Sequence, residues 1–444
     1  MRCVFCAVVV LAGCGEIVKT TDGGPDDASV VTDAPPCETL TAQCDGDVLR
    51  GCVAVGQPPV DVTCPLSCSA TPEPHCTSLR PSFKLTAADM TPASGLMDVT
   101  LAPTTTFNTS DGSITNVRAA GTGVISGIDF YIRDGVGVFR FQTLTIMGSS
   151  TPAQRTPVSG ANALALVSMT SITIDGAILD LQGPCTGAMP GPGGGMGGSG
   201  GSPDNMGGAT NGVAAPAPHG GGGGASEAID GDYCGGGGGG GNGTRGGAGG
   251  ASLQFAGGQG GPSSTAMDFV GGGGGGGGGA FEHTVNHSTG GGGGGAVHLA
   301  ANQRVRIANG GIQAGGCGGN GNTQSCPGGG GAGGMIVIEA DDVEIASATL
   351  AANGGGGGGT QRGVHGQFGS MVAPGGPMSA AQGGGGAGGA NNTAPGVPGT
   401  NGNPAGGGGG GGAGRIVIRT SDGLLTTGNA TISPPTTAGT VPIE

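Results

Sequence analysis

Glycine occupies 111 of the 444 positions of this chain, and the run that begins at Gly271 holds nine glycines in succession. A glycine loses more backbone entropy on folding than any other residue and adds no apolar side chain to a core. Only 10 Phe, 2 Tyr and no Trp are present, so a conventional large core is not expected. Such a composition normally indicates disorder, and an ordered fold has to use glycine in a special way.

A short strand-like unit returns four times between the glycine-rich segments. Its copies begin at Ala163, Gly295, Gly333 and Gly412, and in each copy apolar and polar residues alternate with the two-residue period of a β-strand. Short strands stacked copy on copy indicate a parallel β-helix, in which each copy buries its apolar side against its neighbours. The apolar residues expected on the shared side are Leu164, Leu166, Ile172, Ile174, Ile178, Val297, Leu299, Val305, Ile307, Ile312, Ile336, Ile338, Val343, Ile345, Leu350, Ile416, Ile418, Leu424 and Ile432.

The alignment of the second and third copies makes a specific prediction. It stacks Ile336 and Ile338 on Val297 and Leu299 in one dry column. Glu339, one residue further along the strand, is then expected to face away from that column and to tolerate substitution, because a strand sends alternate side chains to opposite faces.

The glycine-rich excursions, here called lobes, often repeat in triplets. Examples are Gly194-Gly195-Met196, Gly246-Gly247-Ala248 and Gly385-Gly386-Ala387. Three residues per turn is the repeat of polyproline II, and glycine allows such threads to approach one another closely. We therefore expect ordered bundles of extended glycine threads beside the β-helix, with a flexible coil as the alternative.

The first sixteen residues, MRCVFCAVVVLAGCGE, have the outline of a secretory signal (residues 1–13) and are too short to span a bilayer. Leu11-Ala12-Gly13-Cys14 resembles the lipobox of bacterial lipoproteins. That resemblance implies acylation of Cys14, with palmitate as a typical chain, and removal of the preceding peptide. In the enteric version of that family, an aspartate after the cysteine retains the lipoprotein at the inner membrane. Here Gly15 follows Cys14, so the resemblance implies the outer membrane. Residues 14–36 are expected to form a flexible tether.

Ten cysteines remain after Cys14. They are Cys37, Cys44, Cys52, Cys64, Cys68, Cys76, Cys185, Cys234, Cys317 and Cys326. The first six lie in a small module (residues 37–79) that cannot bury enough area alone, so three disulfides are expected there, with fifteen possible connectivities. A zinc site made by Cys64, Cys68, His75 and Cys76 is the alternative. In the lobes, we expect Cys317 to pair with Cys326 and Cys185 to pair with Cys234.

The rest of the chain divides by composition. Residues 80–160 are expected to form a β-strand cap, residues 161–433 the glycine-rich repeat region, and residues 434–444 a C-terminal tail. The formal net charge of -14 excludes a nucleic-acid partner, since a phosphate backbone would be repelled.

Three groups of residues could carry chemistry. Asp341, Asp342 and Glu344 are reminiscent of the carboxylates of β-helix polysaccharide lyases and hydrolases, but acids do not stack on them in the neighbouring copies. Glu282, His283 and His287 have the spacing of a helical metal site, but flanking glycines disfavour a helix. Glu227, Asp230 and Asp232 are typical of a solvated turn and less so of a calcium site. We therefore expect no catalytic residues, no metal and no cofactor.

The region from about Arg80 resembles bacterial glycine-rich surface proteins of the PE-PGRS-like kind, because glycine blocks are followed by an alternating strand such as Ile336-Val337-Ile338; the PE domain is absent. The resemblance implies surface display without an established reaction. The function expected is a lipid-anchored, non-enzymatic surface protein with a structural or adhesive role, whose partner is extracellular polysaccharide or another surface protein. A carbohydrate-active β-helix enzyme is the alternative.

Overall fold

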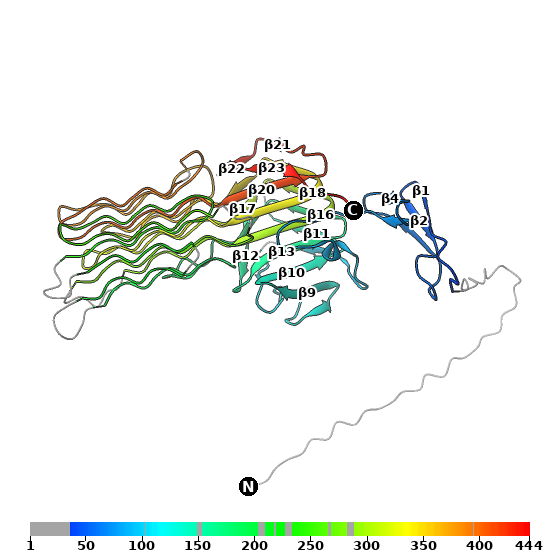
Figure 1. Ribbon diagram of the computed structural model, residues 1–444, viewed down its shortest axis with the longest axis horizontal. Coiled ribbons are helices and arrows are strands. Elements are labelled where there is room, and N and C mark those ends of the chain that lie inside the picture. The colour runs from blue at the N-terminus through cyan, green and yellow to red at the C-terminus, as the bar shows by residue number, and fades with distance from the viewer. Residues whose placement is uncertain are drawn as a thin grey trace, which may run out of the picture.

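The computed structural model describes residues 36–102, 104–148, 153–202, 209–216, 219–226, 233–264, 268–281, 288–393 and 395–444 (Figure 1). The expected signal peptide, Cys14 and nearly all of the tether lie outside these residues. Within them the chain is all-β apart from one 3-10 helix, Ala87–Met90, so the expected fold class is confirmed at that level.

The small module contains β1 (Gln43–Asp45), β2 (Val48–Gly51), β3 (Val60–Thr63), β4 (Cys68–Ser69) and β5 (His75–Cys76). The cap region contains β6 (Asp98–Leu101), β7 (Phe107–Asn108), β8 (Gly123–Ile125), β9 (Ile128–Arg133), β10 (Val136–Phe141), β11 (Thr143–Met147) and β12 (Gln154–Ser159). The repeat region contains β13 (Ala163–Ser168), β14 (Ser171–Asp175), β15 (Ala177–Asp180), β16 (Ala296–Ala308), β17 (Gly311–Gln313), β18 (Met335–Ala346), β19 (Thr349–Ala351), β20 (Arg415–Thr420), β21 (Thr426–Gly428) and β22 (Thr431–Ser433). The last strand, β23 (Thr437–Thr440), follows it.

Successive copies of the unit pair in parallel, strand on strand. One sheet runs in the order β23-β20-β18-β16-β13-β10, and a smaller sheet runs β22-β19-β17-β15-β12-β7. The predicted column is confirmed, since Val297 pairs with Ile336 and Leu299 with Ile338. These four side chains are fully buried in one continuous apolar core between the sheets.

At two positions the residue predicted from the sequence to lie in the core is displaced by one from the residue that does. Leu179 takes the place expected for Ile178, because Leu179 pairs with Ile312 in the next copy. Leu424 is 72% exposed, and Leu425 packs against the core in its stead. Both errors fall after a turn, where the alternation starts again with a new phase.

The parallel register brings the three lobes of the repeat region together. Each lobe leaves the sheets after a short third strand (β15, β17 or β19) and returns at the first strand of the next copy (β16, β18 or β20). Because those strands stack in register, all three lobes start from the same edge and extend side by side as one bundle (Figure 1).

The threads of the bundle are joined by backbone hydrogen bonds with a three-residue period. In residues 235–241, the N–H groups of Gly235 and Gly238 donate to one neighbouring thread, those of Gly236 and Gly239 to a second, and those of Gly237 and Gly240 to a third. The carbonyl groups of the same residues accept from three further threads, which lie at 258–261, 273–279 and 409–412. An inner thread therefore has six neighbours, drawn from all three lobes, and the lobes are ordered wherever they are described.

The two kinds of glycine sequence occupy different places in the bundle. The unbroken runs 235–241, 271–279, 354–359 and 406–412 are buried along their whole length. In the triplet-repeat threads the third residue is turned outward, as for Met196, Ser199, Ser202, Arg245, Ala248 and Ala251, which are exposed or half-exposed. A Cβ atom on Gly239 would lie 2.0 Å from the Gly410 carbonyl oxygen, so inner positions cannot carry any side chain.

Residues 434–444, which were expected to form a tail, are part of the fold. β23 pairs with β20, and further along Glu444 and Ser78 exchange backbone hydrogen bonds of 2.7 and 2.9 Å. These last residues thus fasten the segment that connects the small module to the sheets.

Candidate functional site

All ten cysteines after Cys14 are disulfide-bonded. The module contains Cys37–Cys52, Cys44–Cys68 and Cys64–Cys76, which confirms its three expected disulfides and leaves no thiol for the alternative zinc site. The expected pairing in the lobes is wrong: Cys185 bonds to Cys317, and Cys234 bonds to Cys326. The expected pairs each join cysteines of one lobe, whereas each disulfide joins a thread of the first lobe to a thread of the second.

The two lobe disulfides lie at different heights in the bundle. Cys317 follows β17 by four residues, whereas Cys326 lies nine residues before β18. At about 3.1 Å per residue for an extended thread, Cys326 is roughly 28 Å away from its strand. One bond therefore ties the base of the bundle, and the other ties threads far from the sheets.

A buried polar cluster lies on the sheet face opposite the main core. Glu339 accepts hydrogen bonds from His298 Nε2 at 2.9 Å, from the Ser82 N–H at 2.8 Å and from the Ser82 hydroxyl at 2.5 Å. Arg419 contacts the same carboxylate at 3.1 Å and lies over the ring of Phe83. Glu339 and His298 are both 0% exposed. Glu339 faces away from the apolar column as expected, but it is buried and bonded on that side, which argues against the expected tolerance of substitution.

The cause is a second layer that the sequence did not reveal. Residues Leu79 to Met90 and the lobe residue Phe269 cover this face of the sheet and make a second apolar core with Val337 and Ala300. The signal was available in part, because GAVHLAA and MIVIEA are almost continuously apolar, as strands buried on both faces are.

The electrostatics of the cluster favour an ionised Glu339. Burial alone would raise its pKa, but the charge and hydrogen bond of His298 and the two bonds from Ser82 lower the pKa to about 2. Glu339 lies between a histidine and a serine, whereas a hydrolytic triad needs the histidine in the middle. This arrangement suits fastening of the covering segment to the sheet, and not nucleophilic chemistry.

The carboxylates considered for catalysis lie on the exposed face of the other part of the sheet. Asp342 is 3.0 Å from Arg304, and Glu344 contacts Arg304 and is 3.3 Å from Arg306. Asp341 accepts a hydrogen bond from the Ser421 hydroxyl. Asp342 and Glu344 are thus paired with Arg304, and Asp341 bonds to a serine, so each acid already has a partner.

The same face presents a row of hydrogen-bonding side chains across adjacent strands. Strand pairing places these residues in register, in the order Thr100, Thr145, Thr173, Arg306, Glu344 and Thr426. Neighbouring strands are about 4.8 Å apart, so the row is a regular array of hydroxyls and paired charges. It can donate and accept hydrogen bonds along a polymer.

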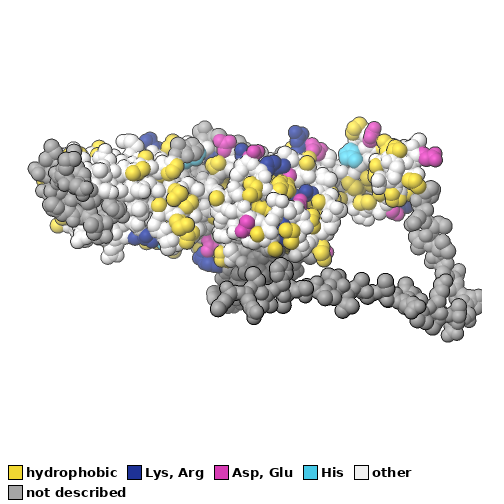
Figure 2. Space-filling view, turned by 90° about the horizontal axis from the view of Figure 1, so that it is seen from below, with side chains coloured by type: hydrophobic (Ala, Val, Ile, Leu, Met, Phe, Trp, Pro, Cys, Tyr) yellow, Lys and Arg dark blue, Asp and Glu magenta, His cyan; other side chains and the backbone are white. Residues whose placement is uncertain are grey.

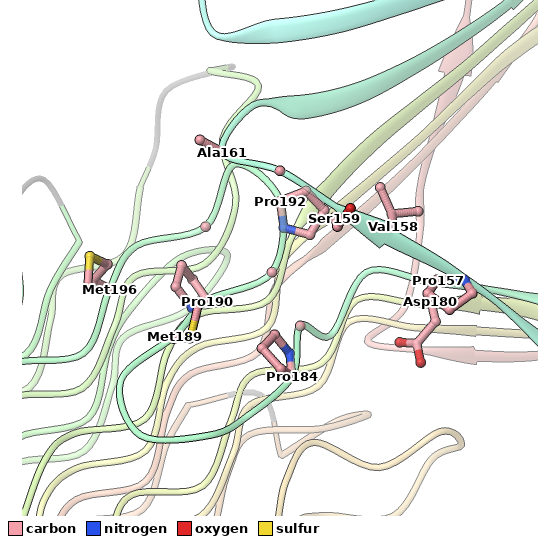
Figure 3. Close-up of a pocket in the computed structure, with 14 residues that line it drawn as sticks. Pro157, Val158, Ser159, Ala161, Asp180, Pro184, Met189, Pro190, Pro192 and Met196 are labelled. Carbon is pink, nitrogen blue, oxygen red and sulfur yellow. The ribbon is translucent and has the colours of Figure 1, made fainter. Parts of the chain in front are cut away.

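A groove of about 690 Å³ lies where the first lobe leaves the sheets (Figure 3). One wall is the end of β12, with Pro157 and Val158, and the other is the start of the lobe, with Pro190 and Pro192. Asp180 is the one titratable lining residue, and its carboxylate lies 2.6 Å from Arg155. The groove is suited to an apolar group, and its only charge is already paired.

Charged side chains are concentrated away from the bundle (Figure 2). In the described parts of the lobes, which span residues 182–295, 314–334 and 352–414, the residues of the Asp, Glu, Lys and Arg types are Arg245, Asp268 and Arg362. The described outer surface of the bundle therefore carries few charges, and it includes exposed apolar side chains such as Leu253 and Met371.

Two groups proposed from sequence, Glu282 with His283 and His287, and Glu227 with Asp230 and Asp232, lie outside the described residues. Within the described ranges no set of three or more His, Cys, Asp or Glu side chains is placed to hold a metal ion. Over the same ranges, no helix has the length and apolar character needed to cross a membrane. Comparison of the chain with protein families, curated proteins and solved structures gave no match.

Proposed function

We propose that this chain is a lipid-anchored protein of the bacterial outer membrane, related in kind to glycine-rich PE-PGRS-like surface proteins, with a structural or adhesive role and no catalytic activity. The sheets are, in this proposal, a short parallel β-helix that serves as the base for the glycine bundle. Cys14 carries the lipid, and the tether follows it.

The observation that carries the proposal is the construction of the bundle. Its inner threads satisfy their backbone groups through six neighbours, and a disulfide ties threads far from the sheets. A body of this kind is stiff because every inner thread is fixed on all sides, and buried backbone polar groups are paired. A stiff, nearly uncharged projection is suited to holding a contact surface away from a cell and offers little to a reaction.

The partner proposed is an extracellular polysaccharide or another surface protein. The array of threonines and paired charges from Thr100 to Thr426 supports a hydroxyl-rich polymer, since each hydroxyl can both donate and accept a hydrogen bond.

Anchoring is tested by phase partitioning of the full chain expressed in a Gram-negative host. The Cys14→Ser protein is expected in the aqueous phase and the unaltered protein in the detergent phase, with Ser29→Ala as the matched change in the tether. Equal partitioning of all three would remove the anchor from the proposal. Depolymerisation of a glycan by purified protein, abolished by Asp341→Asn and Asp342→Asn, would replace the structural role by the enzymatic one.

A further inference from the structure

The small module carries an exposed apolar loop at the point where the chain leaves toward Cys14. Residues 53–59, VAVGQPP, are exposed at every position and contain no charge. Val53 is 40% exposed and Val55 is 64% exposed, and Leu40 on the adjoining segment is 57% exposed. We call residues 53–59 together with Leu40 the Val53 loop. Exposed apolar side chains gathered in so small a module indicate a contact surface.

The loop is fixed directly to the first described residues of the chain. The Cys37 N–H donates to the Gln57 carbonyl at 2.8 Å, and the Gly56 N–H donates to the Cys37 carbonyl at 2.8 Å. The Cys37–Cys52 disulfide closes the same junction. The apolar side chains therefore cannot move away from the place where the tether begins.

The geometry points to a lipid surface as the occupant: we propose that the Val53 loop rests on the bilayer in which Cys14 is anchored. This inference depends on the proposed lipid anchor. Cys14 and Cys37 are 23 residues apart, so a flexible tether gives a root-mean-square separation of about 26 Å. A contact too weak to hold a free protein becomes effective at the millimolar local concentration that a short linker provides.

The charges near the Val53 loop indicate which lipid headgroups it can contact. Glu38 is exposed beside it, while Arg50, on the adjacent sheet of the module, is 3.3 Å from Asp45 and 3.5 Å from Asp61. No free cation is available among the described residues of the module to attract anionic headgroups. The loop therefore fits a zwitterionic or neutral lipid surface, into which Leu40, Val53 and Val55 insert as apolar contacts.

Contact through the loop would also orient the molecule. Figure 1 shows the module and the glycine bundle at opposite ends of the sheets. A module seated on the bilayer directs the bundle away from the membrane.

Tryptophan fluorescence tests the proposal, since the chain has no tryptophan of its own. The full lipidated protein is reconstituted into phosphatidylcholine vesicles that contain brominated lipid, with Val55→Trp as the probe. Leu253→Trp is the matched control, because Leu253 is 74% exposed on the bundle. Quenching of the Val55→Trp probe is expected to be on the order of three-fold greater than that of the Leu253→Trp control. The reason is that interfacial side chains are buried about 5–10 Å into the headgroup boundary.

A second variant separates contact from anchoring. Leu40→Ser and Val53→Ser introduced together into the Val55→Trp protein should reduce its quenching to the level of the control, while the protein still floats with the vesicles. Equal quenching of the Val55→Trp and Leu253→Trp probes in vesicle-bound protein would overturn the proposal. A Val55→Trp emission that is unchanged by lipid and changes only when another protein is added would also overturn it. Failure of the protein to float with vesicles would count against the anchor at Cys14, and so identifies which of the two proposals has failed.

Discussion

His298 Nε2 lies 2.9 Å from the Glu339 carboxylate, and both side chains are completely buried although they belong to neighbouring copies of the unit. The Glu339 carboxylate also contacts Arg419 and accepts two hydrogen bonds from Ser82. One carboxylate thus holds the segment around Ser82 against the sheet. The sheet face opposite the main core is therefore a second interior.

Replacement of this carboxylate is expected to destabilise the protein. Glu339→Ala should lower the free energy of unfolding by about 3 to 5 kcal/mol, because it leaves the buried His298 and the partly buried Arg419 without their partner. Glu344→Ala is the matched control, since Glu344 lies on the same strand with its side chain 22% exposed and in surface ion pairs worth about 0 to 1 kcal/mol. Urea denaturation measures both, and equal midpoints would contradict the structural role of Glu339.

The lowered pKa of Glu339 predicts that the protein becomes less stable in acid. The pKa of Glu339 falls from an ordinary value of 4.5 to about 2 on folding, so its contribution is fully present above pH 4.5 and is lost as the pH falls toward 2. Thermal unfolding from pH 5 to pH 2 should show a steep fall in Tm for the unaltered protein. The Glu339→Gln protein should show a shallower fall, and parallel curves for the two proteins would exclude Glu339 as the cause.

The interior of the bundle should reject even one methyl group. Gly239→Ala would place a Cβ atom 2.0 Å from the Gly410 carbonyl oxygen, and overpacking of this kind costs about 1 to 3 kcal/mol. Gly384→Ala is the control, because the atom nearest to its Cβ would be Met378 Cβ at 3.3 Å. Limited proteolysis should cut the first variant faster than the second. Equal rates would mean that the threads are not closely packed.

Peptide mapping under non-reducing conditions tests the lobe disulfides. Peptides containing Cys234 should be linked to those containing Cys326, with Cys185 linked to Cys317. Closing a separation of 92 residues restricts the unfolded chain by about 4 to 5 kcal/mol in the chain-entropy model. The Cys234→Ser, Cys326→Ser double variant should therefore unfold at lower urea, and a Cys185–Cys234 peptide would contradict the arrangement of the threads.

Much of this architecture could be predicted from local sequence, and the remainder depends on contacts between distant segments. The two-residue alternation places Val297 beside Ile336 correctly, because strand period and burial are local properties. The disulfide partners of Cys185 and Cys234 depend on which threads become neighbours. That choice follows from the stacking of β15, β17 and β19, which no single lobe encodes.

The environment of Glu339 could not be predicted for a similar reason. Its strand begins MIVIEA, which is almost continuously apolar and indicates burial on both faces, but the residue that covers it, Ser82, lies 257 residues earlier in the chain. The row from Thr100 to Thr426 likewise requires the register between copies before its members come together. In both cases the sequence shows which residues are present but does not predict that they lie close together.

The three-residue period of the bundle has a consequence for how such a protein can change its length. Inserting three residues into the outgoing thread and three into the returning thread of a lobe leaves every outward position outward and advances the far end by about 9 Å. An insertion of one residue would instead turn an outward side chain, such as that of Ala248, toward a neighbouring backbone. Lobes of this kind can therefore grow or shrink in whole triplets, and the reach of the molecule is adjustable in steps while the sheets beneath stay unaltered.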